Sequence, residues 1–179
     1  AIPGFFRSAP TEISPANAQD LPAEMQDIEM DLSQAGLTLA GANTWLHGAQ
    51  PPDEAEDGFL RLDEIARLNL VQTELVTLSA CTTASAAPAF TQDLAWLQWA
   101  FLNAGAKRLV MNLWPAPDQQ TIALMVNFYR HSLSQQSHAQ ALRNVQLAMK
   151  QEFPSPLFWG AFVCYGDLTP LPLVVEYKE

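Results

Sequence analysis

The sequence predicts an α/β fold in which a parallel sheet carries helices across its faces. From residue 74 onward, apolar runs of strand length alternate with helical segments in the order strand, helix, strand, helix, helix, strand. That order is typical of parallel strands joined by crossover helices. The chain has 179 residues, of which 49% are hydrophobic and 16% are charged, and a chain of this size can bury a core without disulfides or metals. The composition excludes disordered, collagen-like and coiled-coil proteins.

The residues before the first strong strand give weaker signals. Residues 1–34 mix four prolines with acidic side chains and predict a loop with at most one short helix, over 22–32. Residues 37–40 are a short extended candidate. Residues 48–58 contain two adjacent prolines and four acids, which predicts an exposed loop. Residues 62–68 predict two helical turns.

The first strong strand leads directly to a cysteine. Residues 75–80 are apolar and rich in β-branched side chains, and they predict a strand that ends on Cys81. Thr91 predicts the cap of a helix through residue 104, with Gly105 just beyond its end. Apolar residues surround the axis of this helix, so we expect it to be buried between layers.

A strand, two helices and a strand are predicted in the rest of the chain. The second strand covers residues 108–113, and residues 161–165 form the third. Ser137 and Gln140 match a capping box at the start of a helix. Asp118 opens the helix before it, whose inner faces are expected to carry Ile122, Met125, Phe128, Tyr129 and Leu133.

Charge is distributed unevenly along the chain. Residues 1–80 hold 13 acidic and 3 basic side chains, whereas residues 81–179 hold 6 of each, and the formal net charge is −10. Nucleic-acid binding draws most of its affinity from clustered Lys and Arg, which are absent here. The charge therefore excludes a nucleic-acid partner and favours a protein, peptide or small molecule, although acidity can also serve solubility alone.

The sequence predicts a cytoplasmic protein without metal or cofactor. No apolar run approaches the ~20 residues needed to span a bilayer, which excludes a membrane protein. The only cysteines are Cys81 and Cys164, too few for a disulfide framework, and a reducing compartment is expected. The acids of residues 53–57 do not follow the calcium-loop pattern, so we interpret them as a solvated loop.

The predicted sheet concentrates chemistry at one edge. In open parallel sheets, ligands bind beyond the carboxyl ends of the strands. In this chain those ends lead into residues 81–83, 114–118 and 166–167. We therefore expect a thiol, an indole and two carboxylates to share that edge.

Cys81 is the candidate nucleophile because it lies where a strand gives way to a polar loop and a helix. A reactive thiolate needs an activating base, usually a histidine, and backbone N–H donors for the oxyanion. The alternative interpretation of Cys81 is a buried cysteine that acts as a small apolar residue. Cys164 lies inside a predicted strand and is expected to belong to the core.

None of the three histidines is well placed to act as the base. His131 falls late in a helix, where it complements the helix dipole. His138 follows the cap residue Ser137 and is expected on the surface. His47 is the only histidine in a loop, which makes it a weak alternative base.

Several segments in a fixed order carry a family resemblance: 37–43 (LTLAGAN), 57–60, 63–65, 75–83, 99–106 (WAFLNAGA), 112–115 (NLWP), 118–129, 139–149 and 158–166 (FWGAFVCYG). Together they closely resemble the CHAT domain, a caspase-like peptidase domain found in bacteria behind tetratricopeptide repeats. The resemblance implies a caspase-like, mostly parallel sheet with helices on both faces. It also implies a cysteine endopeptidase whose nucleophile is Cys81, with the amides of Cys81 and Gly4 as oxyanion donors.

Two positions depart from the family pattern. The family places its catalytic His before a Gly, in a segment of the type Ala-Thr-His-Gly-Phe-Phe, and here the chain reads Ala-Ile-Pro-Gly-Phe-Phe, with Pro3 at the place of the base. Proline has no titratable group and cannot deprotonate Cys81. The family also follows its Cys with an acid and a Gly, whereas Thr82, Thr83 and Ala84 follow here.

The resemblance also bears on domain organisation. Residues 1–179 are expected to form one partial caspase-like domain, with a loop-rich opening over 1–35 and a family-like core over 36–179. The family has further strands ahead of the His segment, so we expect the first strands to be missing. An apolar sheet edge left open in this way predicts self-association or a partner chain.

Three hypotheses of function remain at this point. In the first, the chain is a degenerate peptidase that binds a peptide or a partner, for example the tetratricopeptide-repeat region, without cutting it. In the second it is an active cysteine endopeptidase, with Thr82, Trp114 and Asp118 lining the substrate groove and a base from outside this chain. In the third, His47 serves as that base. For Asp118 the alternative role is a helix N-cap.

Overall fold

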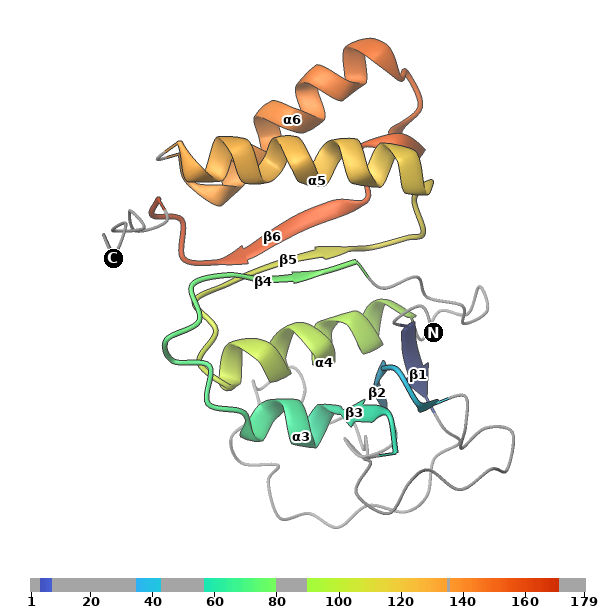
Figure 1. Ribbon diagram of the computed structural model, residues 1–179, viewed down its shortest axis with the longest axis vertical. Coiled ribbons are helices and arrows are strands. Elements are labelled where there is room, and N and C mark those ends of the chain that lie inside the picture. Colours follow the sequence, from blue (N-terminus) through green and yellow to red (C-terminus); the bar gives the residue numbers. More distant parts are fainter. Residues whose placement is uncertain (1–3, 8–34, 43–56, 80–89, 135, 171–179) are drawn as a thin grey trace, which may run out of the picture. The chain divides into compact units, whose positions relative to one another are not determined.

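The computed structural model (Figure 1) describes residues 4–7, 35–42, 57–79, 90–134 and 136–170. The chain forms two compact units. The first comprises residues 1–68 and 80–100, and the second comprises residues 69–79 and 101–179. Both contain helices and strands, so the α/β class predicted from the sequence is confirmed.

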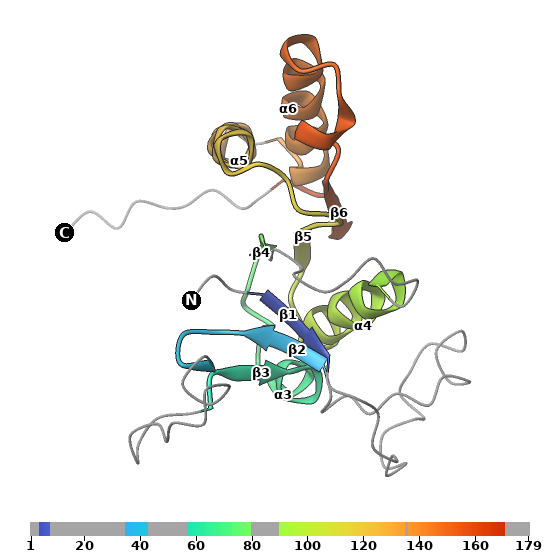
Figure 2. The same cartoon turned by 90° about the vertical axis from the view of Figure 1, so that its right-hand side faces the viewer.

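The first unit contains a three-stranded antiparallel sheet (Figure 2), made of β1 (Gly4–Arg7), β2 (Ala35–Thr38) and β3 (Phe59–Arg61) in that order. The sequence predicts loop for residues 4–7 and no strand for 59–61, and both predictions are wrong. These strands have three or four residues each. Strands this short are held by their partners in the ladder and leave little periodic signal in the sequence.

Helix α3 (Leu62–Arg67) follows β3 without a loop and confirms the two predicted helical turns. Its Leu62 and Ile65 have no exposed surface, and the helix contacts β2 and β3. The backbone N–H of Arg61 donates to the Glu64 carboxylate over 2.7 Å, which satisfies one N–H group at the start of the helix.

Helix α4 (Phe90–Asn103) starts one residue earlier than the cap predicted at Thr91. The side chains buried along it are Leu94, Trp96, Leu97, Ala100 and Phe101. Gly105 has a φ of +99° and follows the helix end as predicted. The N–H groups of Gly105 and Ala106 donate to the carbonyls of Leu102 and Phe101 at 3.0 and 3.1 Å, a Schellman motif that closes the helix.

The second unit contains a mixed sheet of β4 (Val76–Leu78), β5 (Arg108–Asn112) and β6 (Phe162–Gly166). β4 and β5 are parallel, and β6 is antiparallel to β5. The prediction of a third parallel strand is therefore wrong. One crossover helix brings a chain back to the edge where a parallel strand begins, but here two successive helices return it to the opposite edge, where only an antiparallel strand can start.

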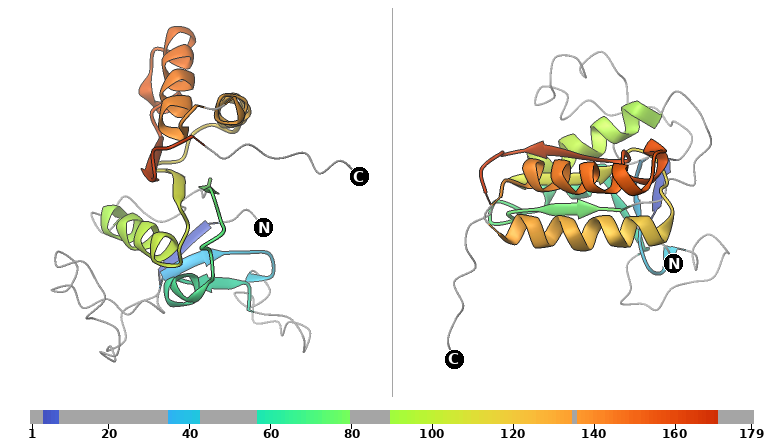
Figure 3. Two further views of the ribbon diagram at one scale, coloured as in Figure 1. Left: turned by 90° about the vertical axis from the view of Figure 1, so that its left-hand side faces the viewer. Right: turned by 90° about the horizontal axis from the view of Figure 1, so that it is seen from above.

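Helices α5 (Asp118–Leu133) and α6 (His138–Glu152) lie side by side on one face of this sheet (Figure 3). A short 3-10 turn, η3 (Pro156–Phe158), joins α6 to β6. Ser137 caps α6 as predicted, because its hydroxyl accepts the Gln140 N–H over 3.2 Å. The buried core of the unit comprises Val110, Leu124, Phe128, Ala141, Leu142, Val145, Met149, Ala161 and Phe162.

Helix α5 is rotated relative to the sequence prediction. Phe128 lies in the core as expected, but Ile122 and Leu133 are both 63% exposed and Tyr129 is 41% exposed. The buried side is instead formed by residues four apart: Leu124, Phe128 and Ser132. Apolar residues occupy both sides of this helix, so the pattern alone does not identify the buried one.

Among the described helices, none is long and apolar enough to cross a membrane.

Candidate functional site

The carboxyl ends of β4 and β5 lie at the same edge of the second sheet. The two strands are parallel, with Leu78 opposite Met111. After β4 the chain leads to Cys81 in the sequence. After β5 it leads through Trp114 to Asp118, at the start of α5. The predicted residues Cys81, Thr82, Pro3 and His47 lie outside the described residues. The described part of the candidate site is therefore the sheet edge that leads to Cys81 and the segment that leaves β5 beside it.

Trp114 is fixed in place directly after β5. The buried Asn112 side chain donates to the Trp114 carbonyl over 3.1 Å, which shapes the turn. The indole N–H donates to the Leu157 carbonyl over 3.4 Å. A methyl group added at Gly160 would meet the indole at 3.4 Å, so the ring packs against the backbone there. A half-buried indole held in this way provides a rigid apolar wall at the edge.

Asp118 is the first residue of α5 and is exposed. The N-cap is Pro117, so the alternative role predicted for Asp118 as N-cap is wrong by one position. Proline at the cap offers no side-chain acceptor, whereas the Asp118 carboxylate lies in the first turn, where the positive end of the helix dipole stabilises a negative charge. Trp114 and Asp118 thus lie on one connection, as the sequence predicts.

The other two predicted positions are Gly4 and Asp167. Gly4 is the first residue of β1, opposite Thr38, and belongs to the first unit, and its role as an oxyanion donor stays a prediction. Asp167 follows β6, and Gly166 lies opposite Arg108, the first residue of β5. Because β6 is antiparallel, Asp167 lies at the amino end of β5, away from Trp114. The prediction of two carboxylates at one edge is therefore wrong for Asp167.

A comparison with known protein families matches residues 19–167 to the CHAT domain. The chain belongs to the CHAT domain family. No curated protein matches the chain. Cys81, Trp114 and Asp118 lie within the matched range, whereas Pro3 and Gly4 precede it. CHAT domains are a caspase-like, peptidase-associated family, so the resemblance read from the sequence motifs is confirmed.

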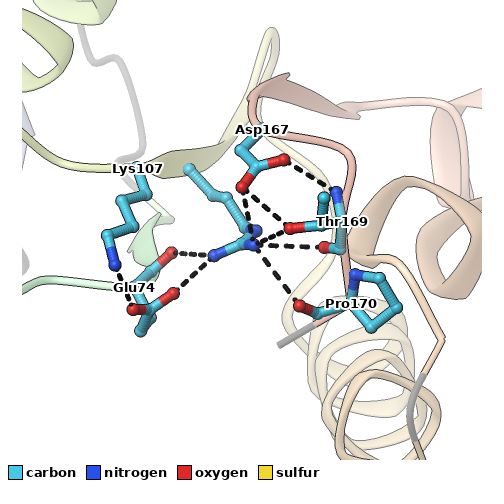
Figure 4. Close-up of polar contacts among 6 residues, drawn as sticks. Glu74, Lys107, Asp167, Thr169 and Pro170 are labelled. Atoms are coloured by element: carbon cyan, nitrogen blue, oxygen red, sulfur yellow. Dashed lines mark hydrogen bonds and ion pairs between the residues drawn. The ribbon is translucent and has the colours of Figure 1, made fainter. Parts of the chain in front are cut away.

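In this CHAT domain, the opposite edge of the second sheet, at the amino end of β5, is held together by a polar cluster around Arg108 (Figure 4). Arg108 is only 2% exposed, and its guanidinium pairs with the Glu74 and Asp167 carboxylates at 2.7 and 3.0 Å. It also donates to the Thr169 hydroxyl at 2.7 Å. Sequence reasoning missed this cluster. The available signal was an arginine directly before the apolar residues 109–111 of a strand, because a buried guanidinium requires acceptors.

The partners of Arg108 titrate below their usual range. Hydrogen bonds from Lys107 and Arg108 lower the pKa of Glu74. Hydrogen bonds from the Thr169 backbone and hydroxyl lower the pKa of Asp167. Both carboxylates are therefore charged at neutral pH, and Arg108 links the segment before β4 to the segment after β6 across the intervening β5.

His138 is fully buried, and the prediction of a surface position is wrong. It is the first residue of α6, which packs against β6. No hydrogen bond of normal geometry from the described residues reaches either ring nitrogen. Burial, and then the charge of Arg108, lower the pKa of His138, although the Tyr165 backbone and Asp167 favour its charged form. His138 is therefore a neutral packing residue at the amino end of β5.

The predicted positions of His131 and Cys164 are confirmed. His131 lies in the last turn of α5, at the negative end of the helix dipole. Cys164 lies in β6 and packs against the core, and its burial raises the pKa of the thiol to about 12. Among the described residues, no group of three or more His, Cys, Asp or Glu side chains could hold a metal ion.

The stability of this CHAT domain is expected to fall as the pH drops below about 6.5. The unfolded chain binds a proton at His138 near pH 6.5, whereas the folded chain resists it because the pKa is lowered. The free energy of unfolding should therefore decrease by up to about 1.4 kcal/mol per pH unit in the window below pH 6.5. Thermal unfolding between about pH 5 and 6.5 measures this slope, above the range in which carboxylates titrate.

A variant without the His138 imidazole tests this prediction. A His138→Gln variant should have a flatter dependence on pH in that window, whatever its stability at neutral pH. An unchanged slope in His138→Gln would contradict the assignment.

Proposed function

We propose that this chain is a CHAT domain of peptidase ancestry that binds a peptide or protein without cleaving it. The observation that carries the proposal is the residue that stands at the place of the base. Pro3 takes the position at which the family has its catalytic histidine. Neither of the two histidines in the described part of the chain, His131 and His138, lies at the sheet edge from which β4 leads to Cys81.

His131 lies far along α5 from the segment that follows β5. Helix α5 begins after the carboxyl end of β5 and runs back along the sheet (Figure 1). From Asp118 to His131 the helix rises about 20 Å, at ~1.5 Å per residue. A general base must come within hydrogen-bonding distance of the thiol, directly or through one water. His138 does not lie there either, because it is buried near Arg108 at the opposite edge of the sheet.

The retained features favour binding. The segment after β5 offers the fixed indole of Trp114 and the exposed carboxylate of Asp118 beside the strand that leads to Cys81. An apolar wall next to a negative charge suits an extended peptide with an apolar or basic side chain. We propose such a peptide, from a substrate-like protein or a tetratricopeptide-repeat region, as the ligand.

The alternative candidate is an active cysteine endopeptidase. Its support is the presence in the sequence of Cys81 and of Gly4, at the positions where the family motif has its nucleophile and a glycine. In this alternative the base is His47 or a group from outside this chain. The two proposals differ in one measurable property, the nucleophilicity of the Cys81 sulfur at neutral pH, because an unassisted thiol has a pKa near 8.5.

Labelling with a thiol-directed peptidyl electrophile separates the two proposals. In the binding-only proposal, Cys81 reacts at neutral pH at a rate similar to that of free cysteine. A Pro3→His variant is expected to react about 100-fold faster, the lower range of what a positioned general base contributes. Mass spectrometry after timed quenching gives the rate at each cysteine.

Two variants assign the label to one of the cysteines. Cys81→Ala should abolish it, and Cys164→Ala should leave it unchanged, because the buried Cys164 thiol stays protonated. Fast labelling of the original chain would refute the binding-only proposal. If His47→Ala then slowed that labelling to background, His47 would be the base, and if the rate persisted, the base would have to be another group.

A further inference from the structure

The helical layer of the second unit carries a charge opposite to that of the rest of the chain. Residues 119–151, which include almost all of α5 and α6, contain three basic residues, Arg130, Arg143 and Lys150, and no Asp or Glu. This stretch therefore has a net charge of +3. The remaining residues, with six basic and 19 acidic side chains, have a net charge of −13, which together with +3 gives the −10 of the whole chain. Solubility alone does not require such a separation, since a net charge of either sign serves it.

The two basic residues of α6 have no acidic partner among the described residues. In the same unit, Lys107 and Arg108 both pair with the Glu74 carboxylate. Arg143 and Lys150 are exposed, and every residue three or four positions away from either of them along the chain is uncharged. In a chain with 19 acids and nine bases, this leaves positive charge on α6 available to another molecule.

Arg143, Leu147 and Lys150 form one line along α6. They are spaced by four and three residues, which places them on the same side of the helix. We call them the α6 line. The two charges at its ends lie about 10 Å apart along the helix axis, at ~1.5 Å per residue, and Leu147 between them is 43% exposed. The core contacts of α6 use other residues, among them Val145 and Met149, so the α6 line is not needed for the fold of the unit.

The ammonium of Lys150 is held over the ring of Trp159, 5.6 Å from its centroid. The ring itself is fixed, because its indole N–H donates to the Phe153 carbonyl over 3.0 Å. A cation–π contact of this kind restricts a long side chain that otherwise moves freely in water. Lys150 therefore loses less conformational entropy than a free lysine when it pairs with a carboxylate.

The distribution of charge favours a protein partner over a nucleic acid or a membrane. Three bases spread over residues 119–151 fall short of the clusters of about four to eight Lys and Arg that attract anionic membranes. Nucleic acids also depend on several phosphate contacts. An extended polyanion would meet the acidic remainder of the chain as well. A short acidic segment lies within one patch, and repulsion from more distant acids is screened over about 8 Å at physiological salt.

From these observations we infer that the α6 line is a docking surface for an acidic segment of a partner protein. The segment presents two carboxylates about 10 Å apart, one for Arg143 and one for Lys150, and an apolar side chain between them for Leu147. Two acids seven positions apart on a helix meet this spacing. α6 packs against β6, at the end of the strand order away from β4. The inference depends neither on Cys81 nor on the ligand proposed for the edge at Trp114.

Titration of the full chain with a synthetic helical peptide, followed by nuclear magnetic resonance, tests the inference. The probe is an alanine-rich helix of about 20 residues with two glutamates seven positions apart and a leucine between them on the same side. We expect saturable shifts of amide resonances concentrated at residues 143–150. The same peptide with glutamine in place of both glutamates should bind about tenfold more weakly, because two exposed ion pairs are lost.

Single substitutions in the chain assign the contact. Arg143→Gln and Lys150→Gln should each weaken binding of the glutamate peptide about threefold, and glutamine preserves the helix. Lys107→Gln is the matched control, since it removes one positive charge of the same unit, at a side chain that is 44% exposed and not on α6. Its affinity for the peptide should stay within about twofold of the original.

Several outcomes would overturn the inference. They are equal binding of the two peptides, which needs no variant to be folded, shifts that centre away from α6, and an equal loss of affinity in Lys107→Gln. Tighter binding of anionic phospholipid vesicles or duplex DNA through the same side chains would assign the α6 line to a membrane or a nucleic acid instead. If Arg143→Gln or Lys150→Gln lowered the midpoint of urea unfolding more than Lys107→Gln does, the bases would be paired within the chain and closed to a partner.

Discussion

Replacing Arg108 by alanine is expected to lower the free energy of unfolding by about 3 kcal/mol, which denaturation by urea would measure. The guanidinium is 2% exposed and holds two carboxylates and the Thr169 hydroxyl. Its removal leaves Glu74 and Asp167 without their shared cation and opens space at the start of β5. Both carboxylates keep contact with water, at 31% and 43% exposure, so the loss stays at the lower end of the range for broken buried pairs.

The neighbouring lysine provides the control. Lys107 pairs with the same Glu74 carboxylate but is 44% exposed. Exposed ion pairs contribute little, so Lys107→Ala should cost less than about 1 kcal/mol. Equal losses in the two variants would mean that burial of Arg108 does not decide its contribution, contrary to the expectation.

A Phe128→Ala variant is expected to lose about 4 kcal/mol of stability in the same experiment. The ring is fully buried in the core of the second unit, between the sheet and α6. Its removal takes away the transfer free energy of the ring and leaves a cavity that the surrounding side chains fill only in part.

Ile122→Ala tests the rotation of α5 directly. Ile122 is 63% exposed, so truncating its side chain should cost less than about 0.5 kcal/mol. The orientation expected from the sequence places Ile122 inside and would make the cost several times larger.

The elements that the sequence predicted well are those with strong local signals. The Ser137 cap, the position of Gly105 and the helical stretches of α5 and α6 all depend on residues close to one another in the chain. Such signals need no knowledge of the rest of the fold. The same holds for β5, in which the apolar residues 109–111 lie between Arg108 and Asn112 and all five residues are buried.

The predictions that failed depend on distant parts of the chain. Whether β6 runs parallel or antiparallel to β5 follows from the path through two helices and not from its own residues. His138 is a polar residue that directly follows the N-cap Ser137, yet the packing of α6 on β6 buries it. The buried side of α5 could not be chosen from a helix with apolar residues on two sides. Long-range packing decided all three outcomes.

The candidate site could be predicted only in outline. The sequence placed Trp114 and Asp118 together after β5, and the structure agrees. It placed Asp167 with them on the assumption of a parallel third strand, and that assumption was wrong. The role of Cys81 stays a prediction, since the residue lies outside the described part of the chain.

The position of Arg108 gives the second sheet two ends with different mechanical properties. At one end a single guanidinium ties the approaches to the outer strands together across the central strand. At the other end of the sheet, where β4 and β5 have their carboxyl ends, no comparable contact among the described residues joins all three strands. Thermal fluctuations of the sheet should therefore grow from the tied end toward the free one. A ligand at the free end can be accommodated by local adjustment while the strand register stays locked at the opposite end.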